Sequence, residues 1–171
     1  MKLKFLIKYL YLTVISISFI SCNNDGRIAV NAEAAFYKNG NIKYLKVRNS
    51  DNGKEMFFCF DEIGRIDSIR NKYNKIIEGQ NFWFYKNGNI NSSAIFSNGK
   101  FDGASFGFYE DGAIKNHRFW RNGKREGYTT DFFQDSIGTL KTIYFYEHDT
   151  VTWSNRSSGN DAGIKVIPTK K

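Results

Sequence analysis

The sequence predicts an all-β fold: an elongated antiparallel β-meander of about five tandem 24-residue hairpin repeats, after an N-terminal signal helix. The first supporting observation is a stretch of seven residues, 36–42, that returns unchanged at 84–90. The second is a set of Phe, Gly and Ile or Leu columns with a period of 24, which is typical of repeat architectures. The third is composition, because 17% of the residues are aromatic although the mean hydropathy is only −0.50. Bulky apolar residues therefore alternate with polar ones, as two-faced strands require.

Residues 1–21 have the pattern of a secretory signal peptide. Lys2, Lys4 and Lys8 precede an almost continuous apolar stretch, residues 9–20, and the segment contains no acidic residue. Twelve helical residues span about 18 Å, which is too short for the roughly 30 Å hydrocarbon core of a bilayer. We therefore expect a signal helix and not a membrane-spanning anchor.

The end of this segment, Phe19-Ile20-Ser21-Cys22, resembles the signal of bacterial lipoproteins. The resemblance implies cleavage before Cys22, two acyl chains on its sulfur, and a further chain such as palmitate on the new amine. It also implies attachment to the bacterial cell envelope, at the outer membrane in a Gram-negative cell. Residues 22–30 would then be a tether. The alternative is a plain secretory signal, with Cys22 an ordinary thiol.

Charge and cysteine content favour neither nucleic acid nor a disulfide framework. The net charge of +8 becomes +5 without residues 1–21, and the basic residues are spread over every repeat, so we expect no nucleic-acid partner. Cys59 is the second of two cysteines, and it lies in an apolar run. With Cys22 acylated, Cys59 has no intramolecular partner and is expected to be a buried, unreactive thiol.

Each repeat, as residues 82–105 illustrate, reads as two strands and two turns. Asn87-Gly88 predicts a hairpin turn, because both residue types tolerate positive φ, and Asn98-Gly99 predicts the next turn. In the following repeat the alternation places Ile114, Asn116, Arg118 and Trp120 on one face and Phe119 on the other. We expect about ten short strands. Because one hairpin buries too little area to fold alone, we also expect the recurring Phe column to form one ladder across the repeats, through Phe60, Phe84, Phe108 and Phe132.

The repeats resemble the MORN-repeat variant family over residues 36–146. The matching blocks are Tyr37…Gly40, Tyr85…Gly88, Tyr109…Gly112, Gly99…Gly103 and Gly123…Gly127. The resemblance implies a curved β-meander, MORN-like over residues 31–153. Bacterial members are often labelled antitoxin-like, and other members are scaffolds or membrane-associated proteins. Residues 154–171 read as a flexible tail in which 164–167 could form one last strand.

No motif in the chain predicts an enzyme, a metal site or a cofactor. Ser105 stands in a Gly-x-Ser-x-Gly motif, but strand-like sequence surrounds it, and Asn81 and Thr129 occupy the equivalent repeat positions. His117 is expected to face solvent and His148 to lie in a polar corner. Neighbouring strand residues point to opposite faces and cannot converge on a metal. The acidic residues cluster where turns are predicted, as at Asp61-Glu62 and Glu110-Asp111.

The most plausible function from sequence is a non-enzymatic, lipid-anchored envelope protein whose repeat sheet binds another protein. A single sheet cannot bury both faces, and accessible aromatic residues beside arginines are typical of protein interfaces. The alternative for this surface is that loops, the tail or a second molecule cover both faces. The sequence leaves the oligomeric state open. One alternative function is an immunity or antitoxin protein that neutralises a partner toxin, and another is an envelope hydrolase. The candidate partner-binding residues are Trp83, Tyr85, Tyr109, Arg118, Trp120 and Arg121.

Overall fold

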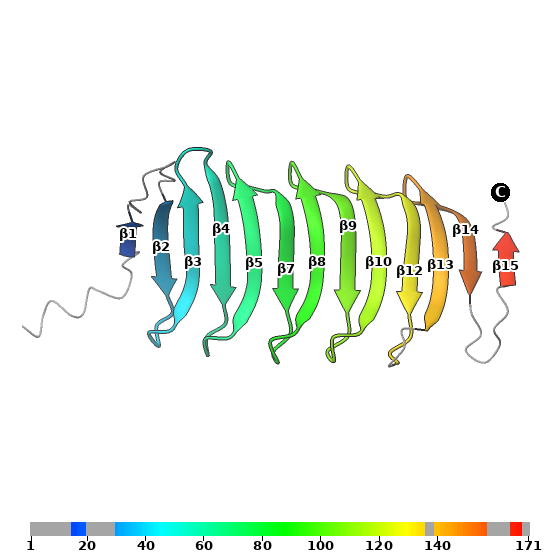
Figure 1. Cartoon of the computed structure of the whole chain (residues 1–171), viewed down its shortest axis with the longest axis horizontal. Helices are drawn as coiled ribbons and strands as arrows, with labels where there is room; N and C mark the ends of the chain where they lie inside the picture. The colour runs from blue at the N-terminus through cyan, green and yellow to red at the C-terminus, as the bar shows by residue number, and fades with distance from the viewer. Residues whose placement is uncertain (1–14, 20–29, 136–138, 157–164, 169–171) are drawn as a thin grey trace, which may run out of the picture. The chain divides into compact units, whose positions relative to one another are not determined.

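All described secondary structure is β-strand, which confirms the predicted all-β class. The computed structural model describes residues 15–19, 30–135, 139–156 and 165–168, and their strands follow one another as an antiparallel meander (Figure 1). Contacts divide the chain into two units, Met1–Ile76 and Ile77–Lys171. The two-residue strand β6 (Ile76–Ile77) lies at this boundary.

The first unit contains five strands that pair antiparallel, each with the next along the chain. They are β1 (Ile15–Phe19), β2 (Val30–Phe36), β3 (Ile42–Asn49), β4 (Lys54–Phe60) and β5 (Ile66–Tyr73).

The second unit continues in the same way. Its longer strands are β7 (Gly79–Phe84), β8 (Ile90–Ser97), β9 (Lys100–Phe108), β10 (Ile114–Arg121), β12 (Gly127–Phe132), β13 (Leu140–Glu147), β14 (Thr150–Arg156) and β15 (Lys165–Pro168). The two-residue strand β11 (Lys124–Arg125) pairs with β10 alone. A last strand in the tail, predicted at 164–167, is present as β15 and pairs with β14.

The predicted signal helix is wrong for the part of it that the structure describes. Residues 15–19 form β1, which pairs with the outer edge of β2. The reason lies in the local sequence, because isoleucine and serine alternate here with a period of two, and the edge of β2 offers backbone hydrogen-bonding groups. The rest of the predicted helix lies outside the described residues, as does Cys22.

Two kinds of turn connect the strands. The hairpin predicted at Asn87-Gly88 is present between β7 and β8, with Gly88 at φ +90°, whereas Asn87 is not among the described residues with positive φ. The loop is a three-residue turn closed by a glycine in the left-handed region, with a register shift between Trp83 and Phe84. The two-residue geometry occurs at Asn98-Gly99, where φ is +50° and +79°.

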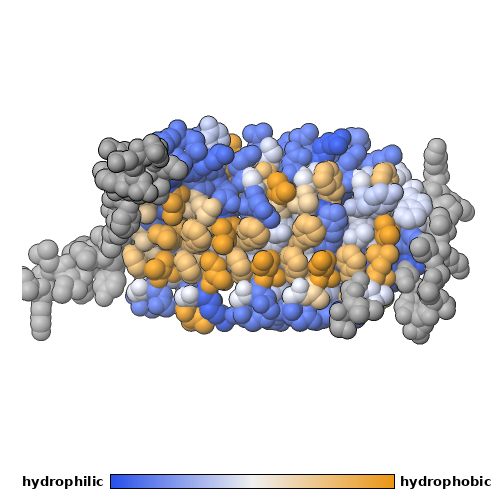
Figure 2. All heavy atoms as spheres, in the orientation of Figure 1, coloured by the Kyte–Doolittle hydropathy of each residue, from blue (hydrophilic) through white to orange (hydrophobic). Residues whose placement is uncertain are grey.

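Few side chains are fully buried, because the strands of each unit form a single layer. Among the residues with described side chains, the buried apolar ones are Cys59, Ala94, Phe96 and Tyr146. Large apolar residues such as Ile95, Phe119 and Tyr128 stay exposed. Figure 2 shows hydrophobic residues gathered in a band across the strands, with hydrophilic residues toward the strand ends.

The predicted Phe ladder does not form by ring contact within the second unit. Successive members of the column, such as Phe84 on β7 and Phe108 on β9, are two strand spacings apart, or about 9.6 Å. Ring stacking instead crosses neighbouring strands, from Trp83 to Phe96 at 6.2 Å between centroids, then to Phe101 at 4.5 Å and Trp120 at 4.9 Å.

Candidate functional site: a groove on strands β7 to β10

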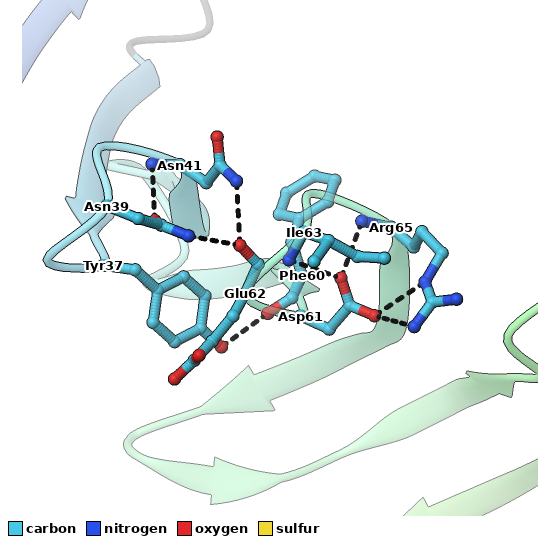
Figure 3. A network of polar contacts seen from close by, with 8 residues as sticks. All are labelled: Tyr37, Asn39, Asn41, Phe60, Asp61, Glu62, Ile63 and Arg65. Carbon is cyan, nitrogen blue, oxygen red and sulfur yellow. Dashed lines mark hydrogen bonds and ion pairs between the residues drawn. The ribbon is translucent and has the colours of Figure 1, made fainter.

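The repeated seven-residue motif has a structural role, which Figure 3 shows in the first unit. The hydroxyl of Tyr37 donates to the carbonyl oxygen of Phe60 at 2.8 Å. The side-chain amides of Asn39 and Asn41 both donate to the carbonyl oxygen of Glu62, at 2.6 and 2.8 Å. Three side chains of one turn thus hold the backbone of the next turn, 21 to 23 residues ahead. We call this set of bonds the clamp.

The second unit repeats the clamp with the second copy of the motif. Tyr85 donates to the carbonyl oxygen of Phe108 at 2.8 Å, and Asn87 and Asn89 donate to that of Glu110 at 2.9 and 2.8 Å. Tyr109, one of the candidate partner-binding residues, donates in the same way to Phe132 at 2.9 Å. The hydroxyls of Tyr85 and Tyr109 are therefore occupied within the fold.

The acidic residues in these turns hold the loops closed. The carboxylate of Asp61 accepts from the backbone N–H of Arg65 at 2.9 Å and of Ile63 at 3.1 Å, and it also accepts from the Arg65 guanidinium. The bond from the Arg65 backbone is the main cause that lowers the pKa of Asp61. Two positions further along its repeat, Asp111 accepts from Gln134 of the next turn at 3.0 Å and from the backbone N–H of Ala113 at 3.0 Å, and the bond from Gln134 is the main cause that lowers its pKa. The predicted turn role of these acids is confirmed.

A groove of about 530 Å³ lies on one face of the second unit. Register places Ser92 between Trp83 and Gly107 in one row, and Ser105 between Ala94 and Arg118 in the next. Directly opposed residues share a face of the sheet. The floor of the groove on β8 and β9 is therefore built of small residues, while β7 and β10 supply large ones. Its lining includes Trp83, Tyr85, Ser92, Ala94, Phe101, Ser105, Gly107, Lys115, Asn116, Arg118 and Trp120.

The aromatic walls of the groove are fixed by packing. Phe96, 8% exposed, touches the rings of both Trp83 and Phe101, and Phe101 stacks on Trp120 at an interplanar angle of 26°. The indole N–H of Trp120 donates to Ser105 Oγ at 2.8 Å. Stacking and a hydrogen bond thus hold the indole of Trp120, and a ring contact with Phe96 supports that of Trp83.

The polar end of the groove carries positive charge. Asn116, 8% exposed, accepts from Arg118 Nη1 at 3.0 Å, and Arg118 Nη2 lies 3.7 Å from a carboxylate oxygen of Asp131. Gly107 makes room for Asn116, because a Cβ at position 107 would lie 2.8 Å from Asn116 Nδ2. The Arg118 side chain remains 37% exposed, so its guanidinium can bind a further acceptor.

Four of the six candidate partner-binding residues line this groove: Trp83, Tyr85, Arg118 and Trp120. Tyr109 and Arg121 are not among its lining residues. Sequence reasoning missed the small floor and the buried Asn116. The run 103–107, which contains two glycines, an alanine and a serine, was a signal for that floor.

The residues weighed for hydrolysis do not form a nucleophile–base pair. Ser105 is opposite Arg118, while His117 is opposite Phe106, so Ser105 and His117 point to opposite faces. His117, which was expected to face solvent, is half-buried, and its ring lies 4.8 Å from that of Phe106 on the neighbouring strand. His148 lies in the turn between β13 and β14, 3.9 Å from a carboxylate oxygen of Glu126.

The described residues offer little else that points to chemistry. They contain no group of three His, Cys, Asp or Glu side chains placed to hold a metal ion. Cys59 is buried as predicted, and its sulfur accepts from Arg70 Nη2 at 2.8 Å. In the part of the chain that the structure describes, no helix is long and apolar enough to cross a bilayer.

No family model matches the chain, and no curated protein matches it.

Proposed function

We propose that this chain is a non-enzymatic, lipid-anchored protein of the bacterial envelope whose repeat sheet binds another protein. The observation that carries the proposal is the groove on β7–β10, with its aromatic walls, small floor and exposed guanidinium. Tryptophan and arginine are the residues that most often dominate protein interfaces.

The groove has the dimensions for an anchor side chain of the partner. β7 and β10 are three strand spacings apart, or about 14 Å. The side chains on β8 and β9 that form the floor between them are small, so they leave room above the sheet. An apolar side chain inserted there would contact both indoles, and burying it contributes roughly 1.5–3 kcal/mol. Since packing and the Trp120–Ser105 bond already fix the walls, little conformational entropy is lost on binding.

Arg118 and Lys115 at the polar end favour a carboxylate beside that anchor. Charge-assisted bonds from a guanidinium to a carboxylate are stronger than neutral ones. The partner segment we expect therefore combines an apolar side chain with a neighbouring Asp or Glu. The anchor to the membrane is Cys22, where each buried CH₂ of an acyl chain contributes about 0.8 kcal/mol and more than one chain gives stable attachment.

Site-specific photo-crosslinking in living cells tests the proposal. A photoreactive residue in place of Lys115, in the groove lining, should give one discrete protein adduct, whereas the same residue in place of the exposed Lys86 outside that lining should not. Trp83→Ala and Trp120→Ala should each remove the adduct. Tyr128→Ala, a matched control because Tyr128 is 60% exposed and is not a lining residue, should leave it.

Two results would contradict the proposal. One is an adduct of equal yield from positions 115 and 86, and the other is an adduct that survives both tryptophan substitutions in chains whose thermal unfolding is unchanged. The anchor is tested separately with labelled palmitate, which wild type should incorporate and Cys22→Ala should not.

A further inference from the structure

The outer edge of β2 is covered by a strand that the proposed processing would remove. β1 pairs antiparallel with β2, from Ile15 opposite Ala34 to Phe19 opposite Val30. β1 lies within residues 1–21, and cleavage before Cys22 would separate it from the chain. The edge of β2 would then present a row of unpaired backbone N–H and C=O groups, which is a template for another strand.

We infer that, in the processed chain, this edge binds an extended segment of another protein as an added antiparallel strand. The segment has about five residues, in which large apolar residues alternate with small uncharged polar ones. This inference rests on the cleavage that is part of the proposed lipid anchoring. It concerns a surface of the first unit and is independent of the groove.

The register of β1 defines the shape that the edge accepts. Two small residues of β2, Ala32 and Ala34, are opposite Ile17 and Ile15. Directly opposed residues are the closest cross-strand neighbours, so an alanine leaves space for a large partner. At the positions between, Ser16 is opposite Glu33 and Ser18 is opposite Asn31.

The charges along β2 favour a neutral partner strand. A carboxylate oxygen of Glu33 lies 2.6 Å from Lys46 Nζ, and the same ammonium lies 3.8 Å from Glu55. Lys46 thus compensates Glu33, and the edge holds no unpaired cation for an acidic segment. An Asp or Glu opposite Glu33 would be repelled.

A second copy of the chain fits this edge less well. Pairing two β2 strands antiparallel about their central residue would place Glu33 opposite Glu33 and Ala32 opposite Ala34. Like charges would face each other, and small residues opposite small ones would lose the packing that a large residue provides.

The test compares two forms of the chain purified from the same bacterial host. Wild type is the processed form, and Cys22→Ala blocks lipoprotein processing and retains β1. The probe is a synthetic peptide that carries residues 14–20 between added lysines, and a peptide of the same composition with its apolar residues grouped is the control. Hydrogen exchange of β2 amides and fluorescence anisotropy are measured.

The expected result is binding of the probe by the processed chain only, with slower exchange in β2 and unchanged exchange in β3 and β4. Ala32→Arg in the processed chain should weaken binding by about tenfold or more, because a long charged side chain replaces the small one. Ile63→Arg, at a residue that is 68% exposed in a turn, should not change it. Unchanged exchange in β3 shows that each variant is folded.

Three results would overturn the inference. Equal binding of the probe by both forms, or by neither, shows that the edge of β2 is not the site. Protection of β2 that rises with protein concentration and needs no probe identifies a second copy as the occupant. A mass showing that wild type still contains residues 15–19 would refute the processing itself, whereas a processed chain that ignores the probe refutes the edge site alone.

Discussion

The turns at the two ends of the strands are stabilised in different ways. At one end, three-residue turns such as 86–88 and 110–112 are tied by clamps between side chains and the backbone of the next turn. At the other end, tight two-residue turns such as Asn98-Gly99 and Asn122-Gly123 have both residues at positive φ. The seven-residue motif is identical in the two turns that carry all three clamp donors, 37–41 and 85–89, while the tight turns vary from Asn-Gly to Asn74-Lys75 and His148-Asp149.

This difference shows which interactions restrict the residue type at a repeat position. A full clamp needs particular donors at particular distances, so the turn at Tyr109, which has Asp111 and Ala113 in place of the two asparagines, keeps only the tyrosine bond of the three. A tight turn needs only a backbone conformation, which Asn and Asp adopt at moderate cost and glycine at none.

The largest expected effect comes from removing one clamp. Tyr85→Phe combined with Asn87→Ala and Asn89→Ala deletes the three clamp bonds and the bond from the Asn89 backbone N–H to Asn87 Oδ1. Since a hydrogen bond contributes about 0.5–1.5 kcal/mol and three of these four are exposed, we expect a loss of about 2–3 kcal/mol of unfolding free energy. Urea denaturation followed by circular dichroism measures it. The control is Lys86→Ala in the same turn, which should change little. A triple variant as stable as this control would show that the clamp has no energetic role.

A smaller effect, of opposite sign, is expected at a tight turn. Lys75 has φ +68°, a conformation that costs a non-glycine residue about 1–2 kcal/mol. Lys75→Gly should therefore raise the unfolding free energy by about 1 kcal/mol, and Gly99→Lys, at φ +79°, should lower it by a similar amount. Lys86→Gly is the matched control, because Lys86 is not among the positive-φ residues, and it should give no gain. Destabilisation by Lys75→Gly would contradict the prediction.

The smallest effect is a pH dependence that distinguishes the acids of the clamped turns. Bonds from Arg65 and Gln134 lower the pKa of Asp61 and Asp111 in the folded state from the ordinary value of 3.8. A depressed pKa contributes stability above the ordinary value that is lost as pH falls through the lower one. Melting temperature should thus decline below about pH 4, and less steeply in Asp61→Asn. Identical slopes in wild type and Asp61→Asn would refute a role for this carboxylate.

The sequence was sufficient to predict the all-β class and the antiparallel order. The 24-residue period and the alternation along segments such as 90–97 depend only on strand geometry. The clamps could not be predicted from residue types alone, because their acceptors are backbone carbonyls, as at Glu62, which any residue supplies. The exact return of Tyr37, Asn39 and Asn41 at 85, 87 and 89 was nevertheless a usable signal.

The sequence predicted the large residues of the groove but not its small floor. Trp83, Arg118 and Trp120 stood out as bulky residues, but a groove also needs residues that leave space. Ser92, Ala94 and Gly107 leave that space because their side chains are small or absent, and only the register of β8 and β9 brings them together. The aromatic ladder was wrong because equivalent repeat positions are separated by an intervening strand.

Each clamp points in one direction, from a turn to the one that follows it. A block of 48 residues, the distance between the two identical motifs, contains both a donor turn and an acceptor turn. If such a block were duplicated within a gene, each new copy would bring both the donors and the acceptors of its clamp. Descendants of this chain could therefore gain or lose whole blocks without any compensating substitution at the junctions.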